Sequence, residues 1–182
     1  MPVEEAYEAR LGSETEKFVK DILAMNSCPL FFPTSVVRRD GGEMTDENRD
    51  ILIYFFTDGF QPVRDLKIES PFYAAELLYR IAEEIMKAEN YYIRAGGYVI
   101  DENTVFVRKK GERTRLKMVY EPSGTENRER NPLDVIAEYL FKDVLLEYRE
   151  YMEEVRNMLK LKENMKNTVR KLAVFRRKMY AL

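Results

Sequence analysis

Hydrophobic positions change their spacing several times along the chain, and each change predicts a different element. Residues 14–26 carry apolar side chains at helical spacing. Residues 34–39 and 49–57 are short and rich in β-branched or aromatic residues, and Asp40-Gly41-Gly42 between them is a strong turn signal. The pattern therefore predicts a short helix followed by a β-hairpin. Residues 51–56 are apolar without alternation, so we expect this strand to be central and covered on both faces.

The next segment has the pattern of one amphipathic helix. Ser70 followed by Pro71 is a good helix start, because the hydroxyl can cap free N–H groups and proline fits the first turn. Gly96-Gly97 ends the segment. The predicted apolar stripe comprises Ala74, Leu78, Ile81, Ala82 and Ile85.

The last part of the chain predicts a second hairpin and a long helix. Residues 104–108 and 115–120 read as strands around the turn at residues 110–112, with the second strand half exposed. Asn131-Pro132 repeats the pattern of a cap followed by proline, and apolar residues at helical spacing then run from residue 133 to 155. We therefore predict an α+β fold of small antiparallel hairpins packed with helices, ending in a long C-terminal helix.

The domain organisation follows from the same pattern and from charge. We expect a flexible N-terminus over residues 1–13, a single α+β domain over residues 14–159, and a basic amphipathic helical tail over residues 160–182. The tail has eight basic residues and one acidic residue, a net charge of +7, so the rest of the 182-residue chain carries −9 and the whole carries −2. A basic end on an acidic body suggests that the tail contacts an anionic surface, a partner or the body itself.

Residue composition narrows the possible chemistry. Histidine is absent, which excludes the usual serine and cysteine nucleophile–histidine pairs and histidine-ligated metals. Cys28 is the single cysteine, so no internal disulfide can form, and we interpret it as a small buried residue. No stretch is long and apolar enough for a membrane span, and the acidic N-terminus has no apolar signal core. These features favour a cytoplasmic protein without a cofactor.

Three patterns have both a structural and a functional interpretation. The pairs Gly41-Gly42 and Gly96-Gly97 belong to no phosphate-binding motif and are read as turn glycines. The segment 101–103 (Asp-Glu-Asn) could hold a divalent cation, but a turn cap is favoured. A cluster of tyrosines between residues 91 and 120 could stack on bases, but its surroundings are not notably basic, so core packing is favoured and no nucleic-acid partner is expected.

The basic tail is the best candidate for an interaction element. Its apolar residues fall near heptad spacing among lysines and arginines, which is typical of helices that bind membrane surfaces or partner proteins. A helix packed on its own domain is the structural alternative. The candidate interaction residues are Lys166, Arg170, Lys171, Phe175, Arg176, Arg177 and Lys178.

Several stretches together resemble a known bacterial domain. They are "ILAMNSCPLFFP", the strand "ILIYFF", the helix "FYAAELLYRIAEEI" and the segment "YYIRAGGYVIDENTVFVRKKGERTRLKMVYEP". Over residues 18–158 the chain resembles the poorly characterised domain that precedes phosphothreonine-reading FHA domains in Gram-positive bacteria. That domain is similar to the pseudokinase domain of type VII secretion components, which implies a reduced protein-kinase C-lobe. Asn103 would then fall near the metal-binding asparagine of a kinase.

The resemblance implies no catalytic residue in this chain. A working kinase needs HRD and DFG aspartates, a β3 lysine and a glycine-rich loop, and Asp58-Gly59-Phe60 has a different order and place from DFG. No FHA domain is present either, so the chain either stands alone or precedes another domain. We expect a non-catalytic interaction or scaffold module in bacterial signalling or secretion, with a protein partner. The alternatives are an anionic-membrane binder that uses residues 160–182 and a divergent nucleotide-binding enzyme.

Overall fold

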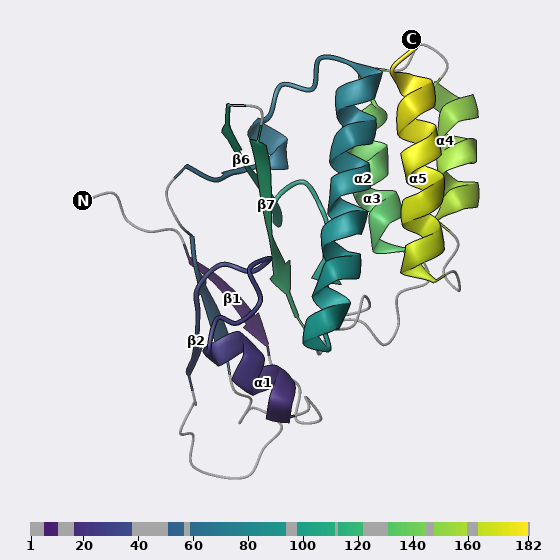
Figure 1. The fold of residues 1–182 in the computed structure, drawn as a ribbon. Helices are drawn as coiled ribbons and strands as arrows, with labels where there is room; N and C mark the ends of the chain where they lie inside the picture. Colours follow the sequence, from purple (N-terminus) through teal and green to yellow (C-terminus); the bar gives the residue numbers. More distant parts are fainter. Residues whose placement is uncertain are drawn as a thin grey trace.

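The structure is a computed structural model, and it has the predicted α+β architecture of helices packed with two small antiparallel sheets (Figure 1). It describes residues 6–10, 17–37, 51–56, 59–93, 98–111, 113–121, 131–144, 148–159 and 164–181. The predicted turns at residues 40–42 and 96–97 lie outside these residues. No helix in the described part of the chain is both long and apolar enough to span a membrane.

The first sheet contains three strands in the order β1-β3-β2, all antiparallel. They are β1 (Ala6–Arg10), β2 (Thr34–Val37) and β3 (Ile51–Phe55). The predicted hairpin of β2 and β3 and the central place of β3 are confirmed. Residues 6–10, within the segment that we expected to be flexible, form β1, and Tyr7 packs edge-on against Tyr54 with ring centroids 6.4 Å apart.

The prediction that β3 is covered on both faces is wrong. Leu52 and Tyr54 are fully buried, but Ile51 and Ile53 are only half-buried and Phe55 is 38% exposed. The strand is central because it has a hydrogen-bonded neighbour on each edge. That position does not require a second layer over its outer face.

Helix α1 (Lys17–Ala24) is anchored to the start of β2 by polar contacts. Val19 and Leu23 are buried, and the Thr34 hydroxyl donates to the Leu23 carbonyl at 2.5 Å. The Asn26 side chain accepts the backbone N–H of Thr34 at 2.6 Å. The chain then passes through a buried stretch that includes Cys28, whose burial confirms its interpretation as a core residue.

The second sheet has the strand order β4-β6-β7-β5. Its strands are β4 (Gln61–Pro62), β5 (Tyr98–Val99), β6 (Val105–Lys110) and β7 (Arg113–Tyr120). The β6–β7 hairpin is the second predicted hairpin and is confirmed. A 3₁₀ turn, η1 (Val63–Asp65), follows β4.

Tyr54 connects the two sheets. Its buried hydroxyl donates to the backbone carbonyl of Tyr120 at 2.7 Å and accepts the N–H of the same residue at 3.1 Å. We call this contact between Tyr54 and Tyr120 the joint. Phe31 lies beside it, with its ring centroid 5.9 Å from that of Tyr98 and 5.6 Å from that of Tyr120. The core is therefore continuous from the small N-terminal sheet to the hairpin.

The four described helices that follow the first sheet pack together on one side of the hairpin, whereas α1 lies beside the first sheet (Figure 1). Helix α2 (Pro71–Ala88) begins as predicted, because Ser70 accepts the N–H of Tyr73, and the predicted stripe is buried. It ends in a 3₁₀ turn, η2 (Glu89–Tyr91). The remaining helices are α3 (Pro132–Phe141), α4 (Tyr148–Met158) and α5 (Met165–Met179).

The predicted single helix over residues 133–155 is wrong, because the chain forms α3 and α4 with a turn over residues 142–144. A 23-residue helix would be about 35 Å long, whereas the 18 residues of α2 span about 27 Å. A straight helix would extend beyond the surface that it covers. Two shorter helices can both bury their apolar faces in the bundle.

We predict that Tyr54→Phe lowers the free energy of unfolding by about 1–3 kcal/mol, because it leaves polar backbone groups of Tyr120 buried without their partner. Urea titration of the wild type and the variant measures the difference. Tyr91→Phe, which removes a hydroxyl from a surface tyrosine, is the control. Equal stability of the two variants would contradict the role of this joint.

Candidate functional site

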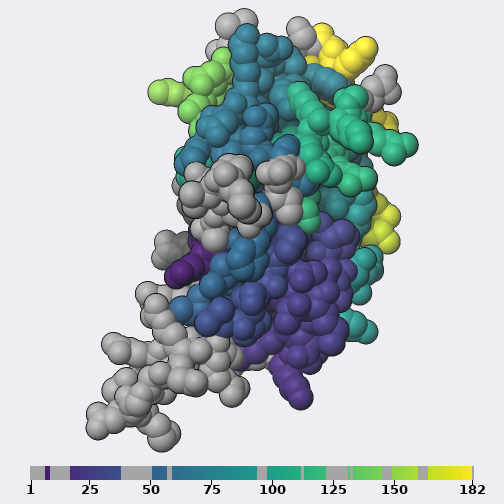
Figure 2. All heavy atoms as spheres, turned by 90° about the vertical axis from the view of Figure 1, so that its left-hand side faces the viewer, coloured from purple at the N-terminus to yellow at the C-terminus, as the bar shows by residue number. Residues whose placement is uncertain are grey.

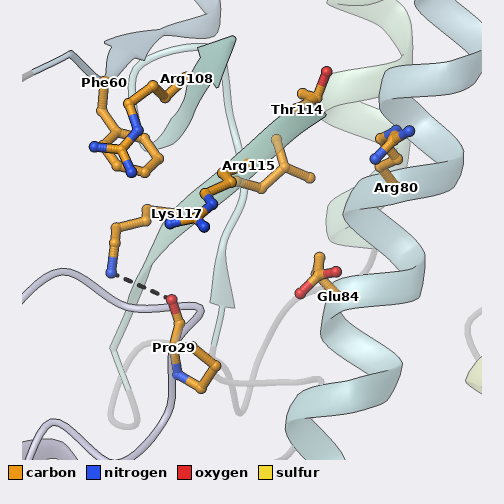
Figure 3. A pocket seen from close by; sticks show the side chains of 9 residues that line it. Pro29, Phe60, Arg80, Glu84, Arg108, Thr114, Arg115 and Lys117 are labelled. Atoms are coloured by element: carbon orange, nitrogen blue, oxygen red, sulfur yellow. Dashed lines mark hydrogen bonds between the residues drawn. The ribbon is translucent and has the colours of Figure 1, made fainter. Parts of the chain in front are cut away.

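A cavity of about 470 Å³ opens between α2, β7 and the segment before β2 (Figure 3). Four cationic side chains line it: Arg80, Arg108, Arg115 and Lys117. Glu84 is the one carboxylate among the described residues that line it. In Figure 3, Arg80 and Glu84 extend from α2 toward β7, while Arg108 and Lys117 lie on the other side of the strand.

The register of the β6–β7 hairpin explains this concentration of charge. Arg108 pairs with Arg115, and Lys110 pairs with Arg113, while Lys117 lies opposite Phe106. Directly paired residues of an antiparallel ladder share a face, and so do alternate residues along each strand. The hairpin therefore carries five cations on one face. We call this set the cationic face: Arg108, Lys110, Arg113, Arg115 and Lys117.

The turn of the hairpin keeps this register. Gly111 has φ +61°, in the left-handed region that the tight turns of two-residue hairpin loops use and that glycine adopts most easily. Figure 2 shows side chains of the hairpin, in green-teal, at the surface beside the segment that follows β3. The cationic face is thus held at an ordered position by the strands themselves.

The charge of the cationic face is not compensated by the described residues. None of its five members forms an ion pair with a carboxylate in the described part of the chain. Like charges directly opposite each other destabilise a strand pair. A fold that keeps such an unfavourable local arrangement often does so at a binding site.

Arg108 is held by an aromatic ring and by a glycine. Its guanidinium lies over the Phe60 ring, with the central carbon 4.6 Å from the ring centroid. Gly59 has φ +78°, and a Cβ atom there would lie 3.1 Å from the Cδ of Arg108. Any larger residue at position 59 would be strained and would crowd the stem of Arg108.

Lys117 reaches back to the segment before β2. Its Nζ donates to the carbonyl of Pro29 at 3.2 Å and to the carbonyl of Phe31 (Figure 3 marks the first). Burial lowers the pKa of Lys117 below its ordinary value, and the neighbouring Arg108 and Arg115 lower it further, while Cys28 opposes them. The ammonium group thus carries a charge that its surroundings disfavour.

The charged side chains that α2 contributes to the cavity already form ion pairs with other residues of the same helix. Arg80 forms an ion pair with Glu76, one turn earlier on α2. Glu84 accepts from Lys87, with Nζ and Oε1 2.8 Å apart. The uncompensated positive charge of the cavity therefore comes from the hairpin and not from α2.

This arrangement is suited to binding anions. Arginine side chains stay protonated and donate several hydrogen bonds in a planar fork that matches carboxylate and phosphate groups. Because an arginine side chain keeps its proton, it is a poor general acid and a poor general base. Among the described residues, no group of three or more Asp, Glu, Cys or His side chains could hold a metal ion.

The structure places the apolar side of the predicted basic tail against the protein itself. Phe175 is only 2% exposed, and its ring centroid is 5.7 Å from that of Phe141 on α3. Val169, Leu172 and Met179 are buried as well, and α5 packs chiefly on α2. This corrects the expectation that Phe175 faces a partner, and it is the structural alternative that the sequence left open.

Two of the other candidate tail residues make ion pairs with neighbouring helices. The Arg176 Nη1 atom is 2.9 Å from Glu76 Oε2, and the Lys178 Nζ atom is 2.6 Å from Glu154 Oε2. The remaining candidates lie exposed on the outer side of α5: Lys166, Arg170, Lys171 and Arg177. They belong to a different surface from the cationic face of the hairpin.

The other sequence candidates have structural roles. Asp101 Oδ1 accepts the backbone N–H groups of Asn103 and Thr104 at 2.8 and 2.9 Å, which confirms the predicted turn cap. Asn103 Oδ1 accepts from the guanidinium of Arg64 at 3.0 Å. Tyr98 and Tyr120 are buried with ring centroids 5.2 Å apart, as core packing predicts. Tyr91 and Tyr92 of the same cluster are exposed, so the prediction of core packing is wrong for them.

No protein-family model matches the chain, and no curated protein matches its sequence. A function for this site can therefore be inferred only from its geometry.

The sequence contains the signal for the cationic face. Basic residues alternate on each side of the turn at Gly111, and the half-exposed pattern predicted for the second strand places Arg115 and Lys117 on its solvent side. The pairing register shows that Arg108, Lys110 and Arg113 share that side.

We predict that the wild type gains stability relative to Lys117→Met as the pH rises from 7.5 to 9.5. Because the pKa of Lys117 is lowered in the folded state, the unfolded chain binds more protons in the window below the ordinary lysine value of about 10.4. Urea titrations at both pH values measure this difference. Lys67→Met, which removes an exposed lysine, tests whether the loss of any lysine has the same effect. If the free energy of unfolding changes with pH in the same way for the wild type and for Lys117→Met, the prediction is contradicted.

We also predict that Phe175→Ala lowers the free energy of unfolding by about 3–5 kcal/mol, because it opens a cavity between α5 and α3. Its neighbour Val174 is 66% exposed, so Val174→Ala should change stability by no more than about 0.5 kcal/mol. Thermal or urea unfolding compares the two. A small effect at position 175 would indicate that α5 is only loosely attached.

Proposed function

We propose that this protein is a non-catalytic interaction module that binds an acidic partner protein through the cationic face and the adjoining cavity. The observation that supports this most directly is the row of five cations without a carboxylate partner among the described residues. Charge-assisted hydrogen bonds from arginine to carboxylate or phosphate are about twice as strong as neutral ones. A surface of this kind can bind a partner without catalysing a reaction.

The extent of the cationic face favours a macromolecular partner. Arg108, Arg115 and Lys117 line the cavity, whereas Lys110 and Arg113 lie on the same face nearer the turn and outside it. An anionic partner that met all five would therefore extend along the hairpin. Because the whole chain is slightly acidic, the cationic face is a local positive field that would guide such a partner to one place.

The alternative functions have less support. Binding to an anionic membrane through the tail would require the apolar side of α5, which is packed on α2 and α3. A nucleotide-binding enzyme of the kinase type would need a metal-binding cluster, and no group of three or more Asp, Glu, Cys or His side chains among the described residues could hold a metal ion. The resemblance to pseudokinase-like bacterial domains is compatible with an interaction module and would place it in signalling or secretion.

Poly-L-glutamate is a suitable probe, because it presents many carboxylates without a defined sequence. We predict that it binds the wild type at low salt, that affinity falls as salt is added, and that Arg115→Gln weakens binding about tenfold. Isothermal titration calorimetry measures this. Arg177→Gln, an exposed cation on α5, is the matched control and should bind like the wild type.

Two results would contradict the proposal. If Arg115→Gln and Arg177→Gln weaken binding equally, the probe responds to overall charge and not to the cationic face. If the protein transfers phosphate from ATP in magnesium buffer and loses this activity in Asn103→Ala, it is an enzyme.

A further inference from the structure

The cavity borders the free edge of strand β7. Four consecutive residues of the strand line it: Thr114, Arg115, Leu116 and Lys117. Consecutive side chains of a strand point to opposite faces of the sheet, so a cavity over one face could contact only alternate residues. A cavity that contacts all four must lie along the edge.

This edge has partners at one end only. At that end the Tyr54 hydroxyl bonds to the backbone of Tyr120, and Phe31 forms a parallel bridge with Met118. No strand among the described residues pairs with the outer edge of β7 from Arg113 to Lys117. The unpaired stretch contains five residues, which extend over roughly 13 Å of strand.

The backbone groups of alternate residues on this edge point away from β6. Met118 donates its N–H to the carbonyl of Leu30 at 2.9 Å, away from β6. Backbone groups of alternate residues point to the same edge of a strand, so Leu116 and Thr114 also direct their N–H and C=O groups outward. The strand thus offers a pattern of donors and acceptors that matches an extended peptide backbone, and Pro29 closes one end of the space.

The side chains beside the edge restrict what such a peptide could carry. On one side an added strand would meet Arg115 and Lys117, with Arg108 behind them. On the other side it would meet Leu116, the Thr114 hydroxyl and the paired residues of α2. Acidic side chains therefore suit every second position, and small or apolar side chains suit the positions between them.

We propose that the Arg113–Lys117 edge of β7 binds an acidic, extended segment of a partner protein as an added strand, with acidic residues at alternate positions. This rests on the proposed function, because it states how the cationic face would recognise its partner. Main-chain hydrogen bonds supply affinity in this mode of recognition, and alternate side chains supply specificity. A nucleic acid or a simple polyanion could satisfy the cations but has no backbone to match the edge.

The experiment uses a fluorescein-labelled nine-residue peptide in which glutamate alternates with alanine. Two further peptides have the same charge, one N-methylated at every alanine and the other at every glutamate. In an added strand only one of these sets of N–H groups faces β7. We expect one methylated peptide to bind about tenfold more weakly than the parent and the other to bind nearly as well, by fluorescence anisotropy.

Variants of the protein provide an independent measurement. Arg115→Gln should weaken all three peptides, and Arg177→Gln should weaken none. Thr114→Pro removes one outward N–H that the β6–β7 ladder does not use, which an edge position tolerates. It should lower the affinity of the parent peptide while circular dichroism and melting temperature show an intact fold; if it does not fold, the methylated peptides decide the question.

Each negative result would lead to a different conclusion. Equal affinities of the three peptides, with weaker binding to Arg115→Gln, would overturn strand addition and leave the proposed function in place. No binding of any peptide to the wild type at low salt would overturn both. A single-stranded oligothymidylate of equal charge that binds more tightly than the parent, with the same dependence on Arg115, would overturn the proposal in favour of a nucleic-acid partner.

Discussion

The hydrogen bonds between the Tyr54 hydroxyl and the backbone of Tyr120 are the constraint on which the arrangement of the molecule depends. They connect the central strand of the first sheet to the end of β7. The same strand, β7, passes from this buried joint to the exposed turn at Gly111, so its two ends lie in opposite environments. Its position relative to α2 and to the segment before β2 is therefore set at the buried end, and the cavity forms where the strand leaves the core.

The hairpin can carry a row of like charges because its other face is well buried. Val105, Val107, Leu116 and Met118 are each less than 10% exposed. Burial of side chains of this size contributes about 1.5–3 kcal/mol each, whereas a cross-strand pair of like charges costs at most about 1 kcal/mol. Phe60 and Phe32 reduce that cost further by covering parts of Arg108 and Lys117. The fold thus keeps charged groups close together without losing its structure.

Local patterns predicted most of the elements, because the physics that they reflect is local. The cap at Ser70, the stripe of α2 and the alternation in β7 all act within a few residues, and the structure confirms them. The predicted long helix was wrong because its break depends on the space available beside α2. Burial of the apolar side of α5 was left open because it depends on Phe141, more than thirty residues away. The cationic face was missed for the same reason, since pairing across the turn brings two basic segments onto one face.

The buried joint also differs from the cationic face in its response to the surrounding solution. Burial raises the pKa of Tyr54 far above its ordinary value, so its phenol keeps its proton well into the alkaline range and remains a donor. Added salt screens the exposed cations within about a Debye length but has little effect on a neutral hydrogen bond inside the core. One strand therefore combines an end that is sensitive to ionic conditions with an anchor that is insensitive to them, so the attraction for a partner can be tuned while the scaffold that presents it stays unchanged.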